Sequence, residues 1–275
     1  MLLRMPELPE VETVRRGLER LLGKTSVIAR IELLRGDLRR PIPAAVATHF
    51  SGQPLLGVRR RAKYLLFETP AGSLLSHLGM TGTWRVAPAG DERLHDHCYL
   101  HLKDGRRLAY RDPRRFGLLD LVRPGAQLAI LERLGPEPLD AGSFHDGYLF
   151  ALCRARKAPV KAVIMDQQVV VGVGNIYAQE ALFRAGIRPT RAARTLTRKR
   201  VRLLIGEIRV VLEAAIAAGG STISDFRQAG GDGGYFQHHF QVYDRAGEAC
   251  HRCQGRLRGG VVGGRGTTWC PRCQT

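Results

Sequence analysis

Four cysteines near the carboxyl end of the chain carry the clearest chemical signal. Cys250 and Cys253 form one Cys-x2-Cys pair, and Cys270 and Cys273 form a second pair after sixteen intervening residues. Four thiolates at this spacing suit one tetrahedral zinc ion, and the alternative of two disulfides rarely persists in a reducing cytoplasm. Because cysteine occupies all four ligand positions, no position remains for a substrate water. The sequence therefore predicts one structural Zn²⁺ ion in a zinc ribbon.

The segment MPELPEVET (residues 5–13) also carries residues that could do chemistry. It places Pro6 directly after a methionine and follows it with Glu7, Glu10 and Glu12. Proline in a first helical turn and acids near a helix start are ordinary features of a helix N-terminus. The segment alone therefore predicts a helix, and any further role of its acids depends on the rest of the chain.

The charge of the chain indicates a polyanionic partner. Its 275 residues include 43 Lys and Arg against 25 Asp and Glu, which gives a formal net charge of +18 and an isoelectric point near 10.5. The basic residues are clustered in residues 59–63, 106–115, 154–161 and 191–202, which favours nucleic acid over a merely basic surface. A membrane surface is the competing partner, but no single basic amphipathic helix supports it.

No segment of the sequence resembles a membrane span or a signal peptide. No run approaches the ~18 apolar residues that a span requires. Arg4, Pro6 and Glu7 interrupt the amino-terminal stretch where a signal peptide needs continuous apolar residues. We therefore expect a cytoplasmic protein without a membrane partner.

The hydrophobic period changes twice along the chain. The stretch from Leu8 has apolar residues at helical spacing and predicts an amphipathic helix. From Thr25 to about Val122 the apolar runs are short and separated by turn residues, which predicts a mostly antiparallel β domain with the opening helix packed on it. The clearest strand-like runs are residues 26–34, 64–69, 97–102 and 116–122.

Helical spacing returns after residues 134–140 (LGPEPLD), whose two prolines are typical of a linker. The clearest helix covers residues 197–219, where Thr197 is placed to cap the start and Gly219 the end. The remaining cysteines, Cys98 and Cys153, are expected to be buried thiols.

The stretch VVVGVGNIYAQEALFRAGIRP (residues 169–189) places glycine turns directly before a predicted helix. Such a turn leaves backbone N–H groups able to receive a phosphate, and Asn175 is positioned to help. A tight turn between two helices explains the glycines equally well. This motif alone leaves both interpretations open.

Six motifs in a fixed order carry a resemblance over nearly the whole chain, from Pro6 to Cys273. They are PELPEVE, RRRAKYLLFE, HLGMTG, DPRRFG, GVGNIYA and the terminal four-cysteine finger. Together they resemble the formamidopyrimidine-DNA glycosylases, bacterial base-excision enzymes that remove oxidised purines. The related endonuclease VIII enzymes open with PEG where this chain has PEL.

The resemblance implies an α+β fold with a leading helix on an N-terminal β-sandwich, a helical helix-two-turn-helix domain and a C-terminal zinc ribbon. We expect the catalytic β-sandwich domain over residues 6–133 and the linker over residues 134–140. The helix-two-turn-helix domain with its lesion-recognition loop is expected over residues 141–240, and the zinc finger over residues 241–275.

The resemblance also implies that a methionine is removed and that Pro6 becomes an amino-terminal nucleophile. Its amine would attack the sugar C1′, expel the damaged base and form an iminium, after which β- and δ-elimination cleave the strand. With unperturbed pKa values of ~7.8 and ~10.4, a terminal amine is unprotonated at neutral pH roughly several hundred times more often than a lysine amine. Glu7 matches the acid–base residue of the family, Glu10 matches a second acid of the pocket, and Lys63 matches a lysine that contacts phosphates around the lesion.

Six further residues match DNA contacts of the family. A base inside a duplex is unreachable until its nucleotide is turned out, and the space left behind must be filled. Met80, Arg114 and Phe116 match the filling residues, since Met and Phe can wedge into a base step and Arg can hydrogen-bond the orphaned base. Lys161, Asn175 and Arg265 match phosphate contacts, the last on the zinc-finger loop.

Two features depart from the pattern of the family. The family begins at the proline, whereas this sequence begins MLLRMPEL. Translation from Met1 would place Pro6 inside an amide without a basic lone pair, so we expect synthesis to start at Met5. The glycine-rich loop QAGGDGGYF (residues 228–236) lacks, near Asp232, a lysine that family members often carry.

The sequence thus predicts a bifunctional DNA glycosylase and AP lyase that acts as a monomer on damaged double-stranded DNA and removes 8-oxoguanine and formamidopyrimidines. An endonuclease VIII-type enzyme for oxidised pyrimidines and a non-catalytic zinc-ribbon DNA-binding protein are the alternatives. A metal-dependent nuclease is disfavoured, because the cysteines saturate their ion and no clustered carboxylates with a histidine remain for another.

Overall fold

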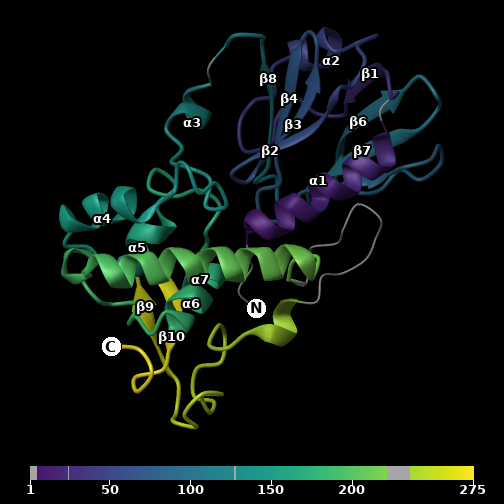
Figure 1. The fold of residues 1–275 in the computed structure, drawn as a ribbon. Coiled ribbons are helices and arrows are strands. Elements are labelled where there is room, and N and C mark those ends of the chain that lie inside the picture. Colours follow the sequence, from purple (N-terminus) through teal and green to yellow (C-terminus); the bar gives the residue numbers. More distant parts are fainter. Residues whose placement is uncertain (1–4, 24, 127, 222–235) are drawn as a thin grey trace. The chain divides into compact units, whose positions relative to one another are not determined.

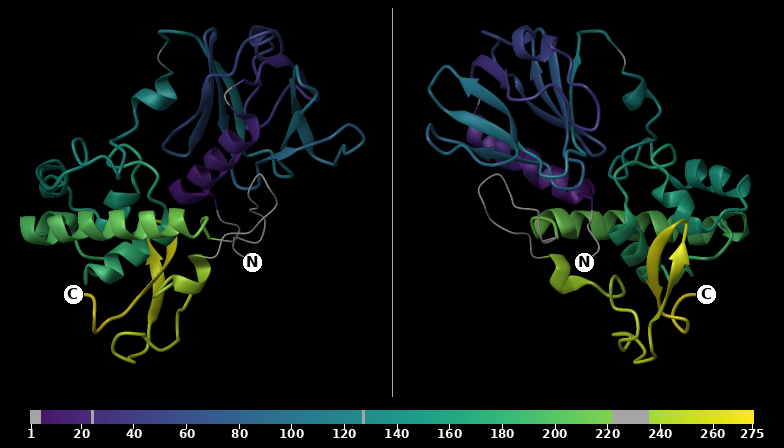
Figure 2. Two further views of the ribbon diagram at one scale, coloured as in Figure 1. Left: turned by 45° about the vertical axis from the view of Figure 1, so that its right-hand side comes forward. Right: turned by 180° about the vertical axis from the view of Figure 1, so that it is seen from behind.

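The computed structural model describes residues 5–23, 25–126, 128–221 and 236–275. The chain forms two compact units. The first contains the residues up to Glu132 and the segment that begins at Ala218, and the second contains Arg133–Ala217 and Phe236–Thr275. Figures 1 and 2 show the helices and strands of both units. None of the helices in the described ranges is long and apolar enough to cross a membrane.

Helix α1 (Leu8–Leu22) opens the first unit, and two acids cap its start. Glu7 is the N-cap, and its side chain accepts the backbone N–H of Glu10. The Glu10 carboxylate in turn accepts the N–H of Glu7 at 3.0 Å, which completes a capping box. Val11 and Val14 on the apolar face are buried. The predicted amphipathic helix is therefore confirmed.

Two four-stranded antiparallel sheets follow α1, one in the order β1-β6-β7-β5 and the other in the order β2-β3-β4-β8. The short helix α2 lies between β1 and β2 in the sequence, and α3 follows β8 (Figure 1). The bounds are β1 (Ile28–Leu33), α2 (Ala45–His49), β2 (Gly57–Arg61), β3 (Tyr64–Thr69), β4 (Gly72–His77), β5 (Thr83–Val86), β6 (Asp96–Leu102), β7 (Arg107–Arg111), β8 (Leu118–Val122) and α3 (Ala129–Glu132).

Side chains from both sheets and from α1 form one core. The Trp84 ring of β5 lies with its centroid 5.0 Å from that of Phe67 on β3 and 5.2 Å from that of Tyr110 on β7, so it joins the two sheets. Its indole N–H donates to the Ser76 hydroxyl at 3.0 Å, which satisfies the buried polar group. Burial of each such side chain stabilises the fold by roughly 1.5–3 kcal/mol. The predicted β-sandwich with a leading helix is confirmed.

Helices dominate the second unit. The longest is α7 (Arg198–Ala217), which packs against α4 (Asp146–Arg154) and α6 (Asn175–Arg184), while α5 (Val160–Met165) precedes the glycine turns before α6. The predicted caps are present: the Thr197 hydroxyl accepts the N–H of Arg200 at 3.3 Å, and Gly219 has a positive φ of 75°. The helix predicted over residues 197–219 therefore forms with nearly the expected bounds.

Strands β9 (Arg258–Val262) and β10 (Arg265–Trp269) pair as an antiparallel hairpin between the two cysteine pairs. Helix α6 packs against β10. A hairpin between two cysteine pairs is the arrangement of the predicted zinc ribbon, and Figure 2 shows it from two sides.

Four strands were not singled out from the sequence: β2, β4, β5 and β7. In β2 (GVRRR) only Val58 is buried, so its sequence shows a cluster of basic residues and no hydrophobic run that would predict a strand. The division into domains at residues 6–133, 134–140, 141–240 and 241–275 stays a prediction. Residues 1–4 and residues 228–235 of the glycine-rich loop lie outside the described residues.

Candidate functional site

Buried carboxylates lie beside Pro6 at the amino end of α1. Pro6 and Glu7 are buried, and Glu10 has no exposed surface. One Glu10 oxygen accepts the Glu7 N–H at 3.0 Å, and the other accepts the N–H and the hydroxyl of Ser221, both at 2.9 Å. The positive end of the helix dipole favours carboxylates at this place. The structure therefore brings together three of the predicted catalytic residues, Pro6, Glu7 and Glu10.

The fourth predicted catalytic residue, Lys63, lies in the two-residue turn between β2 and β3. Ala62, the other turn residue, has a φ of +54°, as tight hairpin turns require. Arg60 on β2 ties this turn to α1, because it donates to Glu12 at 3.0 Å and to the Ala62 carbonyl at 3.0 Å. Burial raises the pKa of Glu12, but hydrogen bonds from Arg15 and other arginines outweigh burial and lower the pKa below its usual value. Glu12 is thus a charged anchor for the turn that carries Lys63.

Met80, Arg114 and Phe116 lie on two adjoining loops, residues 78–82 and 112–117, which we call the wedge loops. The loops touch backbone to backbone, since a Cβ on Gly79 would lie 2.6 Å from the Phe116 carbonyl oxygen. The Arg114 guanidinium lies 4.6 Å from the Phe116 ring centroid, a cation–π contact. Phe116 is 44% exposed, which is unusual for a large aromatic side chain. The structure thus brings the three predicted filling residues onto one pair of loops.

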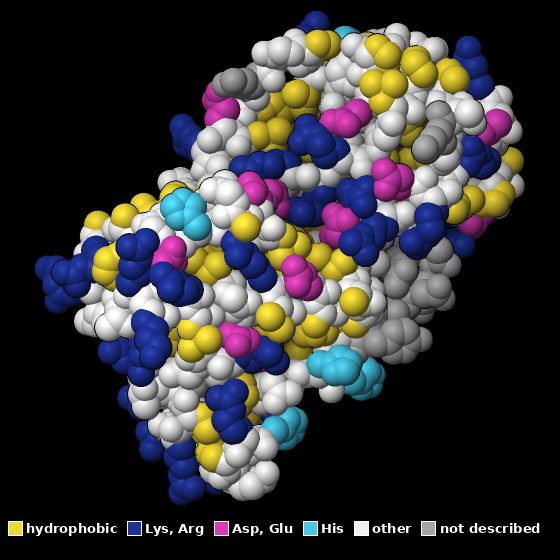
Figure 3. Space-filling model, in the orientation of Figure 1, with side chains coloured by type: hydrophobic (Ala, Val, Ile, Leu, Met, Phe, Trp, Pro, Cys, Tyr) yellow, Lys and Arg dark blue, Asp and Glu magenta, His cyan; other side chains and the backbone are white. Residues whose placement is uncertain are grey.

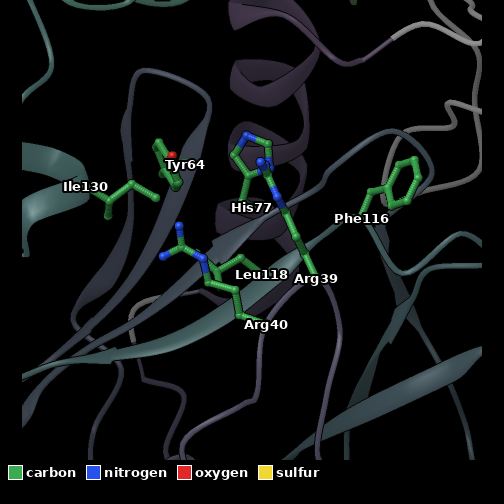
Figure 4. A pocket seen from close by; sticks show the side chains of 7 residues that line it. All are labelled: Arg39, Arg40, Tyr64, His77, Phe116, Leu118 and Ile130. Atoms are coloured by element: carbon green, nitrogen blue, oxygen red, sulfur yellow. The ribbon is translucent and has the colours of Figure 1, made fainter.

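A pocket of about 210 Å³ opens on the first unit beside the wedge loops. In Figure 4, Arg39 reaches toward the His77 ring and Arg40 toward Tyr64. The His77 ring accepts the Gly79 N–H on Nδ1 at 3.0 Å. Burial, together with nearby cationic side chains, lowers the pKa of His77 to about 4, so its imidazole is neutral at pH 7. The lining is Arg39, Arg40, Tyr64, His77, Phe116, Leu118 and Ile130, a set that can receive an anion between two guanidinium groups.

In the second unit, Lys161 and Asn175 form a network with strand β10. The Lys161 ammonium donates to Asn175 Oδ1 at 2.6 Å and to the Thr267 hydroxyl at 2.7 Å, and the residue has no exposed surface. Asn175 donates to the Gly266 carbonyl at 3.1 Å. Arg265, at the start of β10, is exposed. The three predicted phosphate contacts therefore lie close together, but protein groups enclose Lys161 while Arg265 faces solvent.

The four predicted zinc ligands converge. All four Sγ atoms lie within 4.8 Å of one another, with 3.9 Å between Cys250 and Cys273 and 3.5 Å between Cys253 and Cys270. Zn–S bonds of ~2.3 Å in a tetrahedron require sulfur–sulfur distances of about 3.8 Å, so this donor set fits one structural zinc ion. Cys98 and Cys153 are buried thiols outside this cluster, as predicted.

Basic side chains gather on the second unit. Figure 3 shows Lys and Arg along the edge that carries the start of α7 and the zinc ribbon, with few acidic side chains among them. At the start of α4, the Asp146 carboxylate accepts hydrogen bonds from Arg202 and Arg198, which lower its pKa to about 2, so it stays ionised at pH 7. Because Lys and Arg outnumber the acids along this edge (Figure 3), the edge is positive overall, which suits a polyanion.

The structure adds residues that sequence reasoning missed. Ser221 holds Glu10, and the Thr81 hydroxyl donates to the Asp112 carboxylate at 2.5 Å between the wedge loops. Gln179 on α6 accepts the Thr268 N–H of β10 at 2.6 Å. Thr81 and Asp112 lie inside HLGMTG and DPRRFG, so the motifs contained them, but no spacing rule predicts that they pair.

Three family models match successive parts of the chain. The model of the formamidopyrimidine-DNA glycosylase N-terminal domain matches residues 5–119. The model of the formamidopyrimidine-DNA glycosylase H2TH domain matches residues 134–227, and a zinc finger found in FPG and IleRS matches residues 247–275. These matches cover the site at Pro6, Glu7 and Glu10, the hydrogen-bond network of Lys161 and Asn175, and the four-cysteine cluster.

Known proteins are similar over the full length. The formamidopyrimidine-DNA glycosylase of Bdellovibrio bacteriovorus is 57% identical over 270 residues, and that of Stenotrophomonas maltophilia strain R551-3 is 50% identical over 272; each alignment covers 98% of this chain and 100% of the relative. The solved MutM (Fpg) protein of Thermus thermophilus has a TM-score of 0.87 at 43% identity, covering 98% of each chain. A MutM structure with carbocyclic 8-oxo-G containing DNA has a TM-score of 0.88 at 35% identity, covering 98% of this chain and 99% of that one. The chain therefore belongs to the formamidopyrimidine-DNA glycosylase family.

Proposed function

We propose that this chain is a bifunctional DNA glycosylase and AP lyase that removes 8-oxoguanine and formamidopyrimidines from damaged double-stranded DNA. The observation that carries the proposal is the amino end of α1, where Pro6 precedes the buried acids Glu7 and Glu10 in a chain with full-length similarity to this family. Solved relatives support the substrate class: one MutM holds carbocyclic 8-oxo-G containing DNA, and the Lactococcus lactis protein, 34% identical, holds a FAPY-dG containing DNA.

The proposed reaction begins when the residues before Pro6 are absent and its secondary amine is exposed. The amine lone pair attacks C1′, the glycosidic bond breaks, and the departing base takes its electron pair and a proton. Opening of the sugar ring leaves an iminium between the Pro6 nitrogen and C1′. The iminium acidifies the C2′ proton, whose loss expels the 3′ phosphate, and a second elimination expels the 5′ phosphate. Base removal and strand cleavage are thus one sequence of steps.

Glu7, Glu10 and Lys63 support this chemistry in different ways. Glu7 is placed beside Pro6 to move a proton to and from the opening sugar. Glu10 is engaged by Ser221 and by the Glu7 N–H, so it fixes the geometry of the helix start. Lys63 extends from the turn that Arg60 holds against α1 and is proposed to bind a phosphate beside the lesion.

The remaining residues are proposed to open and grip the duplex. Met80 and Phe116 would fill the space left by the everted nucleotide, and Arg114 would hydrogen-bond the orphaned base. Arg265 is exposed and suited to a phosphate, with Asn175 at the N-terminus of α6 beside it. Lys161, whose ammonium donates to Asn175 and Thr267, is proposed to support this phosphate site by positioning Asn175. The pocket at Arg39 and Arg40 adds a further place for backbone phosphate on the first unit.

Reductive trapping tests the proposal. The purified chain is incubated with a duplex that contains 8-oxoguanine, in the presence of borohydride, which reduces an iminium to a stable adduct. We expect a covalent protein–DNA product whose cross-linked peptide begins at Pro6. The control carries an uncleaved tag directly in front of Pro6 and should bind the duplex without forming adduct. Binding without any adduct from the untagged chain would instead identify a non-catalytic zinc-ribbon protein.

Intact mass and a lesion panel complete the test. We expect a mature chain that begins at Pro6, because an amide nitrogen cannot attack C1′. On matched duplexes, excision of 8-oxoguanine and formamidopyrimidine should exceed excision of oxidised pyrimidines. The opposite order would assign an endonuclease VIII-type specificity.

We further propose that the protein acts as a monomer in the cytoplasm. Every residue given a role above comes from one chain, and the basic surface suits a DNA partner. Light scattering of the protein with and without a short damaged duplex should give one chain per duplex.

A further inference from the structure

Two side chains outside the predicted site join the wedge loops. The Thr81 hydroxyl donates to Asp112 Oδ1 at 2.5 Å, and Asp112 Oδ2 accepts the Gly117 N–H at 2.8 Å. Asp112 has no exposed surface, and Thr81 is 8% exposed. A buried carboxylate is costly unless its oxygens accept hydrogen bonds. Both Asp112 oxygens accept such a bond, one from Thr81 on the first wedge loop and one from Gly117 on the second.

Each predicted filling residue is attached to this pair. Met80 directly precedes Thr81, and Phe116 directly precedes Gly117, whose N–H donates to the Asp112 carboxylate. The N–H of Arg114 donates to the Thr81 hydroxyl at 3.2 Å. This one hydroxyl therefore accepts from the Arg114 backbone while it donates to Asp112. Movement of any of the three filling residues would strain bonds that hold the other two.

Close packing limits other arrangements of the loops. Added Cβ atoms on Gly82 and Gly117 would both overlap the Tyr110 hydroxyl, which donates to the His77 carbonyl at 3.0 Å. Arg115, between two of the filling residues, has a φ of +57°, a conformation that residues other than glycine rarely adopt. Hydrogen bonds of the neighbouring residues must therefore hold the loop in this shape.

The side chain of Arg114 keeps donor capacity that the protein does not use. Its Nη1 atom is buried and has no hydrogen-bond partner in the part of the chain that the structure describes. The guanidinium is held against the Phe116 ring. The network thus fixes the backbone of Arg114, while one nitrogen of its guanidinium has no partner within the described protein.

We propose that Thr81 and Asp112 are positioning residues that hold Met80, Arg114 and Phe116 as one rigid wedge. This inference rests on the proposed function. Neither residue touches the reacting atoms; both act through the filling residues on the stability of the opened duplex and on how Arg114 distinguishes the partner base. Their effect should therefore appear with a base that must be turned out of a duplex and disappear when the substrate is already open.

Thr81→Val tests the proposal, because it removes the hydroxyl and keeps the branched shape. Excision of 8-oxoguanine is measured under single-turnover conditions in duplexes with cytosine or adenine opposite, and cleavage is measured on a single strand with a preformed abasic site. We expect the rate of duplex excision to fall roughly tenfold, the effect of about one buried hydrogen bond. The difference between the excision rates opposite cytosine and opposite adenine should also become smaller. Cleavage of the single strand should stay within about twofold of the unsubstituted chain.

Three variants control the experiment. Thr83→Val makes the same change two residues further on, where the hydroxyl has no hydrogen bond among the described residues, and should lose nothing. Thr81→Ser keeps the hydroxyl and should retain most of the discrimination between cytosine and adenine as the partner base. Combining Thr81→Val with Arg114→Ala should cost less than the sum of the single effects, because both act through Arg114.

Asp112→Asn is the second test and should give the same pattern, since its amide presents N–H groups to a donor. The proposal is wrong if both variants lose duplex and single-strand activity equally, or if partner-base discrimination is unchanged.

Excision by the unsubstituted chain separates failure of the proposed function from failure of the positioning role. If that chain excises nothing, the proposed function fails. If it excises and Thr81→Val behaves like Thr83→Val, only the positioning role fails.

Discussion

The Glu10 carboxylate accepts hydrogen bonds from both the N–H and the hydroxyl of Ser221, each at 2.9 Å, although the two residues are 211 positions apart in the sequence. The same carboxylate accepts the Glu7 N–H at the start of α1. Glu10 therefore joins the helix start beside Pro6 to the segment that follows α7.

Glu10→Gln should disturb this junction, because an amide has only one accepting oxygen for three donors. We expect a loss of about 1–3 kcal/mol in the free energy of unfolding. We also expect a large fall in base excision, since the helix start positions Pro6. Ser221→Ala removes one of the three donors and should have a smaller effect on both. Urea unfolding and single-turnover excision measure these effects; unchanged stability of Glu10→Gln would contradict the junction.

His77 should make stability depend on pH between about 6.5 and 4. Its pKa is lowered to about 4 by burial and nearby cations, so the unfolded chain binds a proton in this range that the folded chain does not. Stability from this group is therefore complete above pH 6.5 and is lost as the pH falls toward 4. The loss should be about 1–3 kcal/mol.

His77→Asn should flatten that dependence while its side-chain oxygen still accepts the Gly79 N–H. Urea unfolding at pH 7, 5.5 and 4.5 measures the slope for both proteins. Identical slopes would show that His77 is not the titrating group.

Zinc removal should unfold the ribbon and spare the sandwich. Structural zinc sites contribute ~10–16 kcal/mol of binding energy, and the β9–β10 hairpin has little core of its own. We expect one zinc per chain by metal analysis. Cys270→Ser should lose the metal and most DNA affinity, whereas Cys153→Ala, which changes a buried thiol outside the cluster, should retain both. Hydrogen exchange should then speed up in β10 and stay slow in β6. An equal loss of protection in both strands would show that the ribbon does not unfold separately from the sandwich.

Lys161 and Arg265 should differ in how their loss changes the salt dependence of DNA binding. Each phosphate contact contributes about 0.9 to the slope of log K against log salt concentration. Arg265→Met should lower the slope by about that amount, because the side chain is exposed. Lys161→Met should weaken binding with little change of slope, because its ammonium is already bound to Asn175 and Thr267. A fall of about 0.9 for Lys161→Met would instead establish a direct phosphate contact.

Much of the site could be predicted from residue types and local spacing. The zinc ligands follow from two Cys-x2-Cys pairs, since a tetrahedral ion needs four thiolates at such spacing. The helix at Leu8 follows from its apolar period and its acids, and the order of six motifs identified the family. Strands such as β2 were missed because a strand that buries one residue in five leaves almost no hydrophobic pattern.

Local residue types and their order were enough to predict the family, the α+β fold class and the zinc site, and to locate the motifs that form the amino-terminal site and the wedge loops. Which distant groups meet could be seen only in the folded chain. The fold paired Glu10 with Ser221 and Thr81 with Asp112, and it enclosed Lys161, a predicted phosphate contact, among protein groups. Hydrogen bonds act over about 3 Å of space, whatever the separation along the chain, so only the folded backbone selects these partners.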